Sequence, residues 1–338
     1  MPLISSFIKK NILVFSLIFL VYAWFFVNHI TPQKTSLNVL GADSNISLFQ
    51  EPQAGRDPIL NALNSAKSEI LIEVYLLSDK QIIKSLEDAK KRGVVVDVML
   101  EEHPFGGGNL NNNSKTELSK AGIGVEWANS SFSLTHEKTI VIDKNRAFIL
   151  NQNLTASSFT KNREYDVYDI NQEDVAEIRN VFISDWERKN FTPTKTNLII
   201  SPINSRPILT GLIEKAYKEL DLEIEDINDE QIVSQLCNKS EKINIKIIIP
   251  TLSQVSSNKD SINKLLSCGV YIKTVSSPYI HAKLILVDNI KAYIGSVNLS
   301  TQSMDKNREV GIILSQADSL KTLLQTFNSD WNIGKSIN

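Results

Sequence analysis

The sequence predicts an α/β protein built from two copies of one domain and preceded by a single transmembrane helix. Three observations predict it: an apolar stretch near the N-terminus, an internal repeat, and helix-like and strand-like patterns that alternate within each copy. The 338 residues are 42% hydrophobic and 22% charged, which suits globular domains and excludes a disordered chain. Two cysteines are too few for a disulfide-rich scaffold.

The apolar stretch covers residues 12–27, in which Ser16 is the only polar residue. As a helix it would be about 24 Å long, close to the roughly 30 Å of a bilayer core. Lys9 and Lys10 precede it, so the positive-inside rule predicts a cytoplasmic N-terminus and an extracytoplasmic chain after His29. A cleaved signal peptide and a buried core helix are the alternatives. No small-x-small cleavage site follows directly, which favours an uncleaved anchor.

The repeat has a constant offset that places His136 on His281 and Trp186 on Trp331 without a gap. The period is too long for a solenoid unit, so it indicates two copies of a domain. Other matched pairs are Lys138 with Lys283, Asp143 with Asp288, Asn153 with Asn298, and Asn162-Arg163-Glu164 with Asn307-Arg308-Glu309. The predicted organisation is a cytoplasmic tip and anchor at 1–30, a linker at 31–45, and domains at 46–192 and 193–338.

Within each copy the alternating patterns predict a central mixed sheet with helices on its faces. In the first copy they predict helices at 58–67 and 80–91, the second capped by Asp79, and strands at 70–77, 94–100, 123–127 and 138–142. In the second copy they predict helices at 208–220 and 230–237, and strands at 222–227, 243–249 and 270–275.

Three further features receive structural interpretations. Residues 103–108, with three glycines and an asparagine-rich run behind them, lack the Lys and Ser/Thr of a P-loop. A flexible connection is the preferred interpretation there, and a mobile flap over the site is the alternative. Trp186 and Trp331 are interpreted as packing residues. Cys237 and Cys268 are interpreted as free buried thiols, although an extracytoplasmic location would permit a bridge.

The chemistry concentrates in two short elements, HEK at 136–138 and HAK at 281–283, each of which opens an apolar, strand-like run. Residues i and i+2 of a strand point to the same face, so each imidazole should lie beside an ammonium group. Asp143 and Asp288 follow the histidines by seven residues and therefore face the other way. We interpret these two aspartates as turn residues at the strand ends.

Two His-Lys pairs at equivalent positions of a repeat favour an anion over a metal ion. A lysine next to each histidine repels a cation, and no further cluster of Cys, His or Asp surrounds them in the sequence. Two lysines can neutralise phosphate oxygens, while two histidines can act as nucleophile and proton donor. The elements therefore predict phosphodiester chemistry without a metal or other cofactor.

HEKTIVID and HAKLILVD resemble the HxKxxxxD motif of the phospholipase D superfamily, and IGSVN at 294–298 is similar to its GSxN element. The resemblance covers about residues 45–335. It implies two α/β domains with mixed sheets, packed with pseudo-twofold symmetry around one active site, so that no obligate dimer is needed.

The resemblance also implies roles for individual residues. His136 would be the nucleophile that forms a phosphohistidine and His281 the acid/base, although pseudo-symmetry leaves this order open. The phosphate would be held by Lys138, Lys283, Asn153, Asn298 and Ser296. The imidazoles would be oriented by Glu164 and Glu309. The first copy departs from the motif at Leu150-Asn151, where the second has Gly295-Ser296. This departure predicts a tighter or differently shaped first half-site.

Three functions remain open at this point. A membrane-anchored enzyme that hydrolyses phospholipids or transfers phosphatidyl groups is preferred, because the anchor would hold the site beside the lipid headgroups and make phospholipid and membrane its partners. A nuclease is the alternative. After the three N-terminal lysines the chain has 33 basic and 38 acidic residues, a net charge of −5, which weakens nonspecific DNA binding. An inactive binding module would need a broken catalytic set, whereas both His-Lys pairs are intact.

Overall fold

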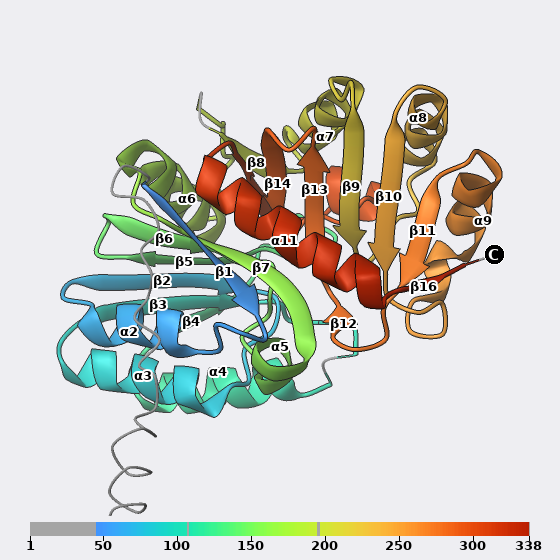
Figure 1. The fold of residues 1–338 in the computed structure, drawn as a ribbon. Coiled ribbons are helices and arrows are strands. Elements are labelled where there is room, and N and C mark those ends of the chain that lie inside the picture. The colour runs from blue at the N-terminus through green and yellow to red at the C-terminus, as the bar shows by residue number, and fades with distance from the viewer. Residues whose placement is uncertain (1–44, 107, 195–196, 338) are drawn as a thin grey trace, which may run out of the picture. The chain divides into compact units, whose positions relative to one another are not determined.

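The computed structural model describes residues 45–106, 108–194 and 197–337, which contain two eight-stranded mixed sheets (Figure 1). No helix in this part of the chain is long and apolar enough to span a membrane. The predicted anchor at 12–27 lies outside the described residues.

The first sheet is formed almost entirely by the first repeat. Its strands lie in the order β1 (Ile46–Glu51), β7 (Asn162–Asp169), β6 (Arg146–Ile149), β5 (Lys138–Ile142), β2 (Glu69–Val74), β3 (Val95–Leu100) and β4 (Gly124–Trp127). A short strand of the second repeat, β12 (Tyr279–Ile280), pairs in parallel with β7. The pairs β2–β3 and β3–β4 are parallel, and β2–β5, β5–β6, β6–β7 and β1–β7 are antiparallel.

The second sheet repeats this topology. Its strands lie in the order β16 (Lys335–Ser336), β11 (Tyr271–Thr274), β10 (Asn244–Ile249), β9 (Glu219–Ile224), β13 (Lys283–Val287), β14 (Lys291–Gly295), β15 (Glu309–Leu314) and β8 (Leu198–Ser201). The pairs β9–β10 and β10–β11 are parallel, as are their counterparts β2–β3 and β3–β4. The prediction of two α/β halves with mixed sheets is therefore confirmed.

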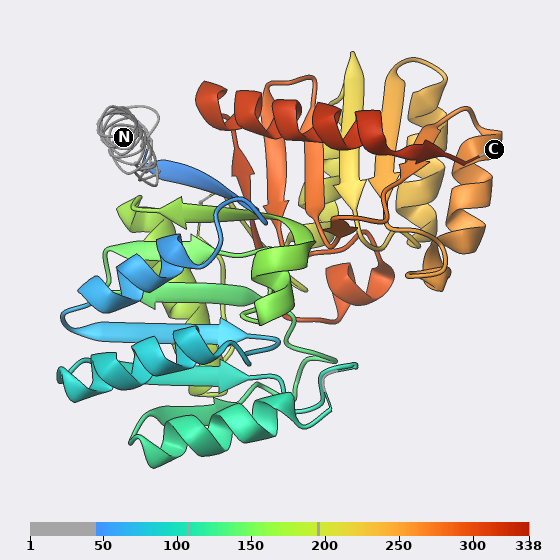
Figure 2. The same ribbon diagram turned by 60° about the horizontal axis from the view of Figure 1, so that its bottom comes forward.

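The helices cover the two faces of each sheet. The first half contains α2 (Asp57–Ser65), α3 (Lys80–Lys91), α4 (Leu110–Lys120), α5 (Ala156–Lys161) and α6 (Gln172–Trp186). The second half contains α7 (Ser205–Glu214), α8 (Glu230–Ser240), the 3-10 turn η1 (Ser256–Asn258), α9 (Lys259–Ser267), α10 (Thr301–Asp305) and α11 (Ala317–Ile333). Figure 2 shows α2 and α3 over the first sheet and α11 crossing the strands of the second.

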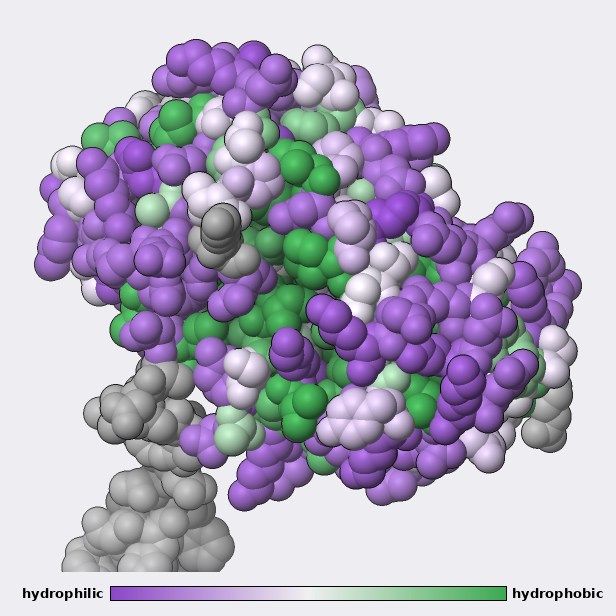
Figure 3. Space-filling model, turned by 90° about the horizontal axis from the view of Figure 1, so that it is seen from above, coloured by the Kyte–Doolittle hydropathy of each residue, from purple (hydrophilic) through white to green (hydrophobic). Residues whose placement is uncertain are grey.

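Three hydrophobic cores follow from this layering. One lies between the first sheet and α2, α3 and α5, and another between the second sheet and α7, α8 and α9. The third is shared, because it combines the inner faces of both sheets with α6 and α11. Trp186 and Trp331 pack against the shared core, where they stack on Phe182 and Phe327. From above, hydrophilic residues dominate the periphery and apolar residues gather toward the middle of the face (Figure 3).

Two buried ion pairs join the halves reciprocally. Arg163 at the start of β7 donates to both carboxylate oxygens of Asp330 in α11, at 2.5 and 3.1 Å. Arg308, directly before β15, donates to both oxygens of Asp185 in α6, at 2.7 and 3.0 Å. Each half thus contributes the arginine of one pair and the aspartate of the other, at equivalent positions of the repeat, as a pseudo-twofold relation requires.

Two of the predictions about local structure are wrong. The helix predicted at 208–220 ends at Glu214, and strand β9 already begins at Glu219. The asparagine-rich run is also helical, since α4 begins at Leu110. Its weak apolar periodicity concealed this helix, which is fixed by tertiary contacts instead: Asn111 is buried and its side chain hydrogen-bonds three backbone groups, of Leu77, Tyr75 and Glu101.

The prediction of free thiols is also wrong. Cys237 and Cys268 form a disulfide, with their Cα atoms 5.4 Å apart. Cys237 lies in α8 and Cys268 caps the C-terminal end of α9, and these helices pack side by side on the second sheet. The bridge became possible because helix packing brought together two residues that are distant in the sequence.

Candidate active site

Both HxK elements lie at the seam between the halves, at the start of equivalent strands. Lys138 opens β5 and Lys283 opens β13, each opposite the last residue of the neighbouring β2 or β9. The backbone before each histidine pairs with the other half: Thr135 bridges to Arg308, and Ile280 in β12 pairs with Arg163. The fold thus brings the two motifs to one shared face.

Each imidazole is oriented by a glutamate from the opposite half. Nδ1 of His136 lies 2.9 Å from Oε2 of Glu309, and Nδ1 of His281 lies 2.7 Å from Oε2 of Glu164. Both glutamates are fully buried. A carboxylate at Nδ1 fixes the proton on that nitrogen, so Nε2 of each ring is the atom available for chemistry.

The surroundings of His136 keep its ring neutral. Burial lowers the pKa of His136 to about 4, although the charge of Glu309 opposes this and that of Lys138 adds to it. Burial alone would raise the pKa of Glu309, but His136 and Lys138 lower it below its usual value. A neutral imidazole hydrogen-bonded through Nδ1 carries its free lone pair on Nε2, the form that a nucleophile requires.

The two lysines lie fully buried beside their histidines. Lys138 donates to the carbonyl oxygen of His136, and Lys283 donates to that of His281 at 2.7 Å. Burial lowers the pKa of Lys138 to about 7; nearby glutamates counter the effect and the charge of Lys283 reinforces it. The two lysines are the groups in this region that could neutralise the charge of an anion.

The other predicted phosphate ligands differ in their surroundings. Asn153 and Asn298 are at most 9% exposed, and their Oδ1 atoms have no hydrogen-bond partner among the described residues. Ser296 is fully buried, and its hydroxyl exchanges hydrogen bonds with the backbone N–H and C=O of Val310, at 3.1 and 3.2 Å. Ser296 therefore holds β15 in place, whereas each of the two asparagines keeps an unpaired oxygen among the described residues.

Asp143 and Asp288 lie at the opposite ends of their strands from the histidines, in turns with positive φ. Asp143 accepts the backbone N–H groups of Lys67 and Ser68, and Asp288 accepts those of Lys218 and Glu219. Burial alone would raise the pKa of Asp143, but these backbone donors lower it to about 2. Both aspartates close the turn that leads into the neighbouring strand.

The departure at Leu150-Asn151 has a packing explanation. A Cβ atom at Gly295 would lie 2.3 Å from Cα of Gly311, so β14 and β15 approach too closely for a side chain there. In the first half Leu150 is instead buried in the core between the first sheet and α2, α3 and α5. Asn151 donates across the seam to the carbonyl oxygen of Gly295 and so joins the two half-sites.

A carboxylate of the site was missed by sequence reasoning. Glu225, directly after β9, accepts from Nζ of Lys283 at 2.8 Å and lies 3.5 Å from Nε2 of His281. Its counterpart in the first half is Tyr75, directly after β2, whose ring lies edge-on to His136 at 4.8 Å. A comparison of the two repeats upstream of the motif could have found this difference.

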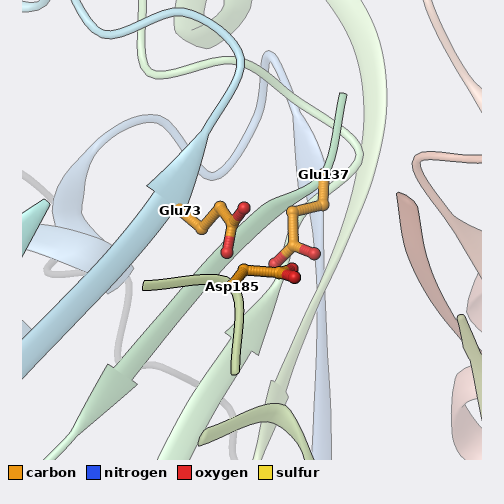
Figure 4. Close-up of side chains that lie close together, drawn as sticks. All are labelled: Glu73, Glu137 and Asp185. Atoms are coloured by element: carbon orange, nitrogen blue, oxygen red, sulfur yellow. The ribbon is translucent and has the colours of Figure 1, made fainter. Parts of the chain in front are cut away.

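A second group of carboxylates lies beneath the first half-site. Glu73, Glu137 and Asp185 are fully buried and point toward one another, with oxygens within 4.8 Å (Figure 4). Burial raises the pKa of Glu137 to about 8 and that of Glu73 well above its usual value, and like charges add to both effects. Asp185 is already paired with Arg308. The pair Glu73–Glu137 therefore retains protons at neutral pH.

The pair Glu73–Glu137 predicts that the free energy of unfolding decreases as the pH rises. The folded state binds protons that the unfolded chain releases near pH 4.5, so stability falls as pH rises from about 4.5 to about 8. The free energy of unfolding, measured with urea between pH 5 and 8, should decrease with pH in the natural protein. In Glu137→Gln this decrease should be smaller by about 1 kcal/mol per pH unit. Glu126→Gln, at an exposed position of β4, should keep the natural slope. Equal slopes for all three proteins would contradict the assignment.

A family described as "Cardiolipin synthase, PLD-like domain" matches residues 59–186 and 209–331. The fold and the paired motifs define the class, and the chain belongs to this family of the phospholipase D superfamily.

Individual proteins are similar to this chain in sequence or in fold. Cardiolipin synthase 2 of Bacillus cereus is 24% identical over 318 residues, which cover 80% of this chain and 62% of that protein. The chain thus spans less than two thirds of this relative. Among solved structures, the phosphatidylserine synthase of Haemophilus influenzae has a TM-score of 0.63 at 10% identity and covers 87% of both chains. Polyphosphate kinase of Porphyromonas gingivalis has a TM-score of 0.66 at 16% identity, and the aligned part covers 84% of this chain and 50% of the kinase chain. These two structures share the fold.

Proposed function

We propose that this chain is a metal-independent phosphodiesterase of the phospholipase D type, which cleaves or transfers phosphatidyl groups through a phosphohistidine. The observation that carries the proposal is the reciprocal arrangement at the seam. Each histidine is oriented through Nδ1 by a buried glutamate of the other half, beside a buried lysine. Two such units supply a nucleophile, a proton donor and positive charge for a phosphate, with both half-sites in one chain.

The proposed reaction has two balanced steps. The lone pair on Nε2 of one histidine forms a bond to phosphorus, the bond to the leaving oxygen breaks, and the other histidine gives that oxygen its proton. A water or alcohol then gives its proton to the second histidine and bonds to phosphorus, and the N–P bond breaks. Lys138, Lys283, Asn153 and Asn298 would hold the phosphate oxygens through both steps.

A phospholipid substrate is supported by three observations. The matching family and the relative from Bacillus cereus are both described as cardiolipin synthases. The apolar segment at 12–27 would hold the site beside lipid headgroups. The disulfide between Cys237 and Cys268 suits an extracytoplasmic location, which the lysines before the segment also predict.

The test uses the full-length chain in vesicles that contain phosphatidylglycerol or phosphatidylcholine, and, separately, plasmid DNA. We expect release of the headgroup alcohol or formation of a new phosphatidyl ester, at an unchanged rate in EDTA. Nicking of plasmid without lipid turnover would make the chain a nuclease. Turnover of neither substrate would identify an inactive binding module, and loss of turnover in EDTA would contradict the metal-independent mechanism.

A further inference from the structure

One of the positions at which the two half-sites differ is occupied by Tyr75 in the first and by Glu225 in the second. The backbone shows the equivalence: the N–H of Tyr75 donates to the carbonyl of Glu137, and that of Glu225 donates to the carbonyl of Ala282. The carbonyl oxygens of Tyr75 and Glu225 in turn each accept from a buried asparagine, Asn111 and Asn258 respectively. The fold thus places an aromatic ring against one catalytic pair and a carboxylate against the other.

Glu225 is held firmly in the second half-site. Oε2 accepts from Nζ of Lys283 and Oε1 accepts from the hydroxyl of Tyr279, both at 2.8 Å. Burial alone would raise the pKa of Glu225, but the charges of His281 and Lys283 and these hydrogen bonds hold it below its usual range. Glu225 is therefore a carboxylate at neutral pH, and its Oε2 lies 3.5 Å from the reactive Nε2 of His281.

The two imidazoles consequently have different neighbours. His281 has a carboxylate oxygen at each ring nitrogen, from Glu164 at Nδ1 and from Glu225 at Nε2. His136 has Glu309 at Nδ1, while the ring of Tyr75 lies edge-on to it and beneath the ammonium of Lys138. The ionisable groups around His281 come from four places in the fold: Glu164 in β7, Glu225 after β9, Tyr279 in β12 and Lys283 in β13.

We propose that Glu225 is a positioning residue that divides the labour between the histidines, holding His281 as the proton donor and leaving His136 as the nucleophile. The inference rests on the proposed function. An imidazolium carries an N–H at both nitrogens, and His281 has a carboxylate to receive each of them. A nucleophile needs an unprotonated Nε2, and burial, which lowers the pKa of His136 to about 4, provides it.

The first step then has a defined direction. Nε2 of His136 bonds to phosphorus, the bond to the leaving oxygen breaks with its electron pair on that oxygen, and the oxygen takes the proton from Nε2 of His281. His281 remains as a neutral imidazole, ready to take the proton of the incoming water or alcohol. Glu225 keeps its hydrogen bond to Lys283 throughout and exchanges no proton.

The direct test follows the proton on His281 by nitrogen NMR of the full-length chain, without substrate. Removal of a negative charge 3.5 Å from Nε2 weakens proton binding there. We therefore expect Glu225→Gln to lower the proton affinity of His281 about tenfold or more, with a smaller change at His136. The matched control is Asp226→Asn, since Asp226 bonds Asn228 and Ser257 instead. Unchanged titration of His281 in Glu225→Gln would overturn the proposal.

The kinetic test compares a phosphatidyl ester of an alkyl alcohol with one of p-nitrophenol, which leaves as a stable anion and needs no proton. Glu225→Gln should slow kcat for the alkyl ester about 10- to 100-fold and for the p-nitrophenyl ester less than about threefold. Equal losses on both esters would indicate a structural role and overturn the proposal. A natural protein that turned over neither ester would defeat the proposed function instead, and the titration would still decide whether Glu225 controls the proton on His281.

Discussion

Replacement of His136 by Asn should abolish turnover and leave no phosphoenzyme. The residue supplies the only lone pair that the proposed first step uses, and its partner Glu309 cannot replace it because that carboxylate is fully buried. We expect kcat to fall by about 10³-fold or more on any phosphodiester. The measurement is rapid quenching with a substrate labelled in the phosphate, followed by identification of the labelled residue, which should be His136 in the natural protein.

Replacement of His281 by Asn should give a different pattern. A p-nitrophenyl ester should still release about one equivalent of p-nitrophenol in a burst, because that leaving group needs no proton. Turnover should then stall, because no base activates water to attack the phosphohistidine. His103→Asn is the control, since its side chain is 84% exposed on a surface loop. A burst in His136→Asn, with the label on His281, would reverse the two roles.

The paired motifs and the mixed sheets could be predicted because they depend on patterns within short stretches of the sequence. The repeat preserves its register around both HxK elements, and strand parity places His136 beside Lys138 and Asp143 on the other face. The pairing of each glutamate with the histidine of the other half could not be predicted. Glu309 faces His136 only because the halves pack reciprocally, and no spacing in the sequence encodes which imidazole a distant carboxylate will face.

The other misses have the same physical origin. Asn111 lies in the first turn of α4, a helix that lacks apolar periodicity and is stabilised instead by tertiary hydrogen bonds from this side chain to the backbone. Cys237 and Cys268 meet because α8 packs against α9. Glu225 lies far from the motif in sequence and reaches it through the antiparallel pairing of β9 with β13. Contacts between distant segments decide all three.

Removing one partner of an ion pair across the seam should cost a large share of the protein's stability. Asp330→Ala would leave the guanidinium of Arg163, 6% exposed, without its carboxylate in the shared core. Such an uncompensated buried charge costs about 3–5 kcal/mol, which urea unfolding followed by circular dichroism can measure. The loss should also slow kcat, because Arg163 directly precedes Glu164, which orients His281.

The comparison that isolates the charge is the double variant Arg163→Met with Asp330→Leu. Replacing both partners by apolar residues removes the unpaired ion, so most of the lost stability should return even though the ion pair is gone. A surface pair provides the matched control: Asp305 contacts Arg206 at 2.6 Å but is 36% exposed, so Asp305→Ala should cost less than about 1 kcal/mol. If the double variant were as unstable as Asp330→Ala, the loss would come from packing of α11 against the sheet and not from the unpaired guanidinium of Arg163.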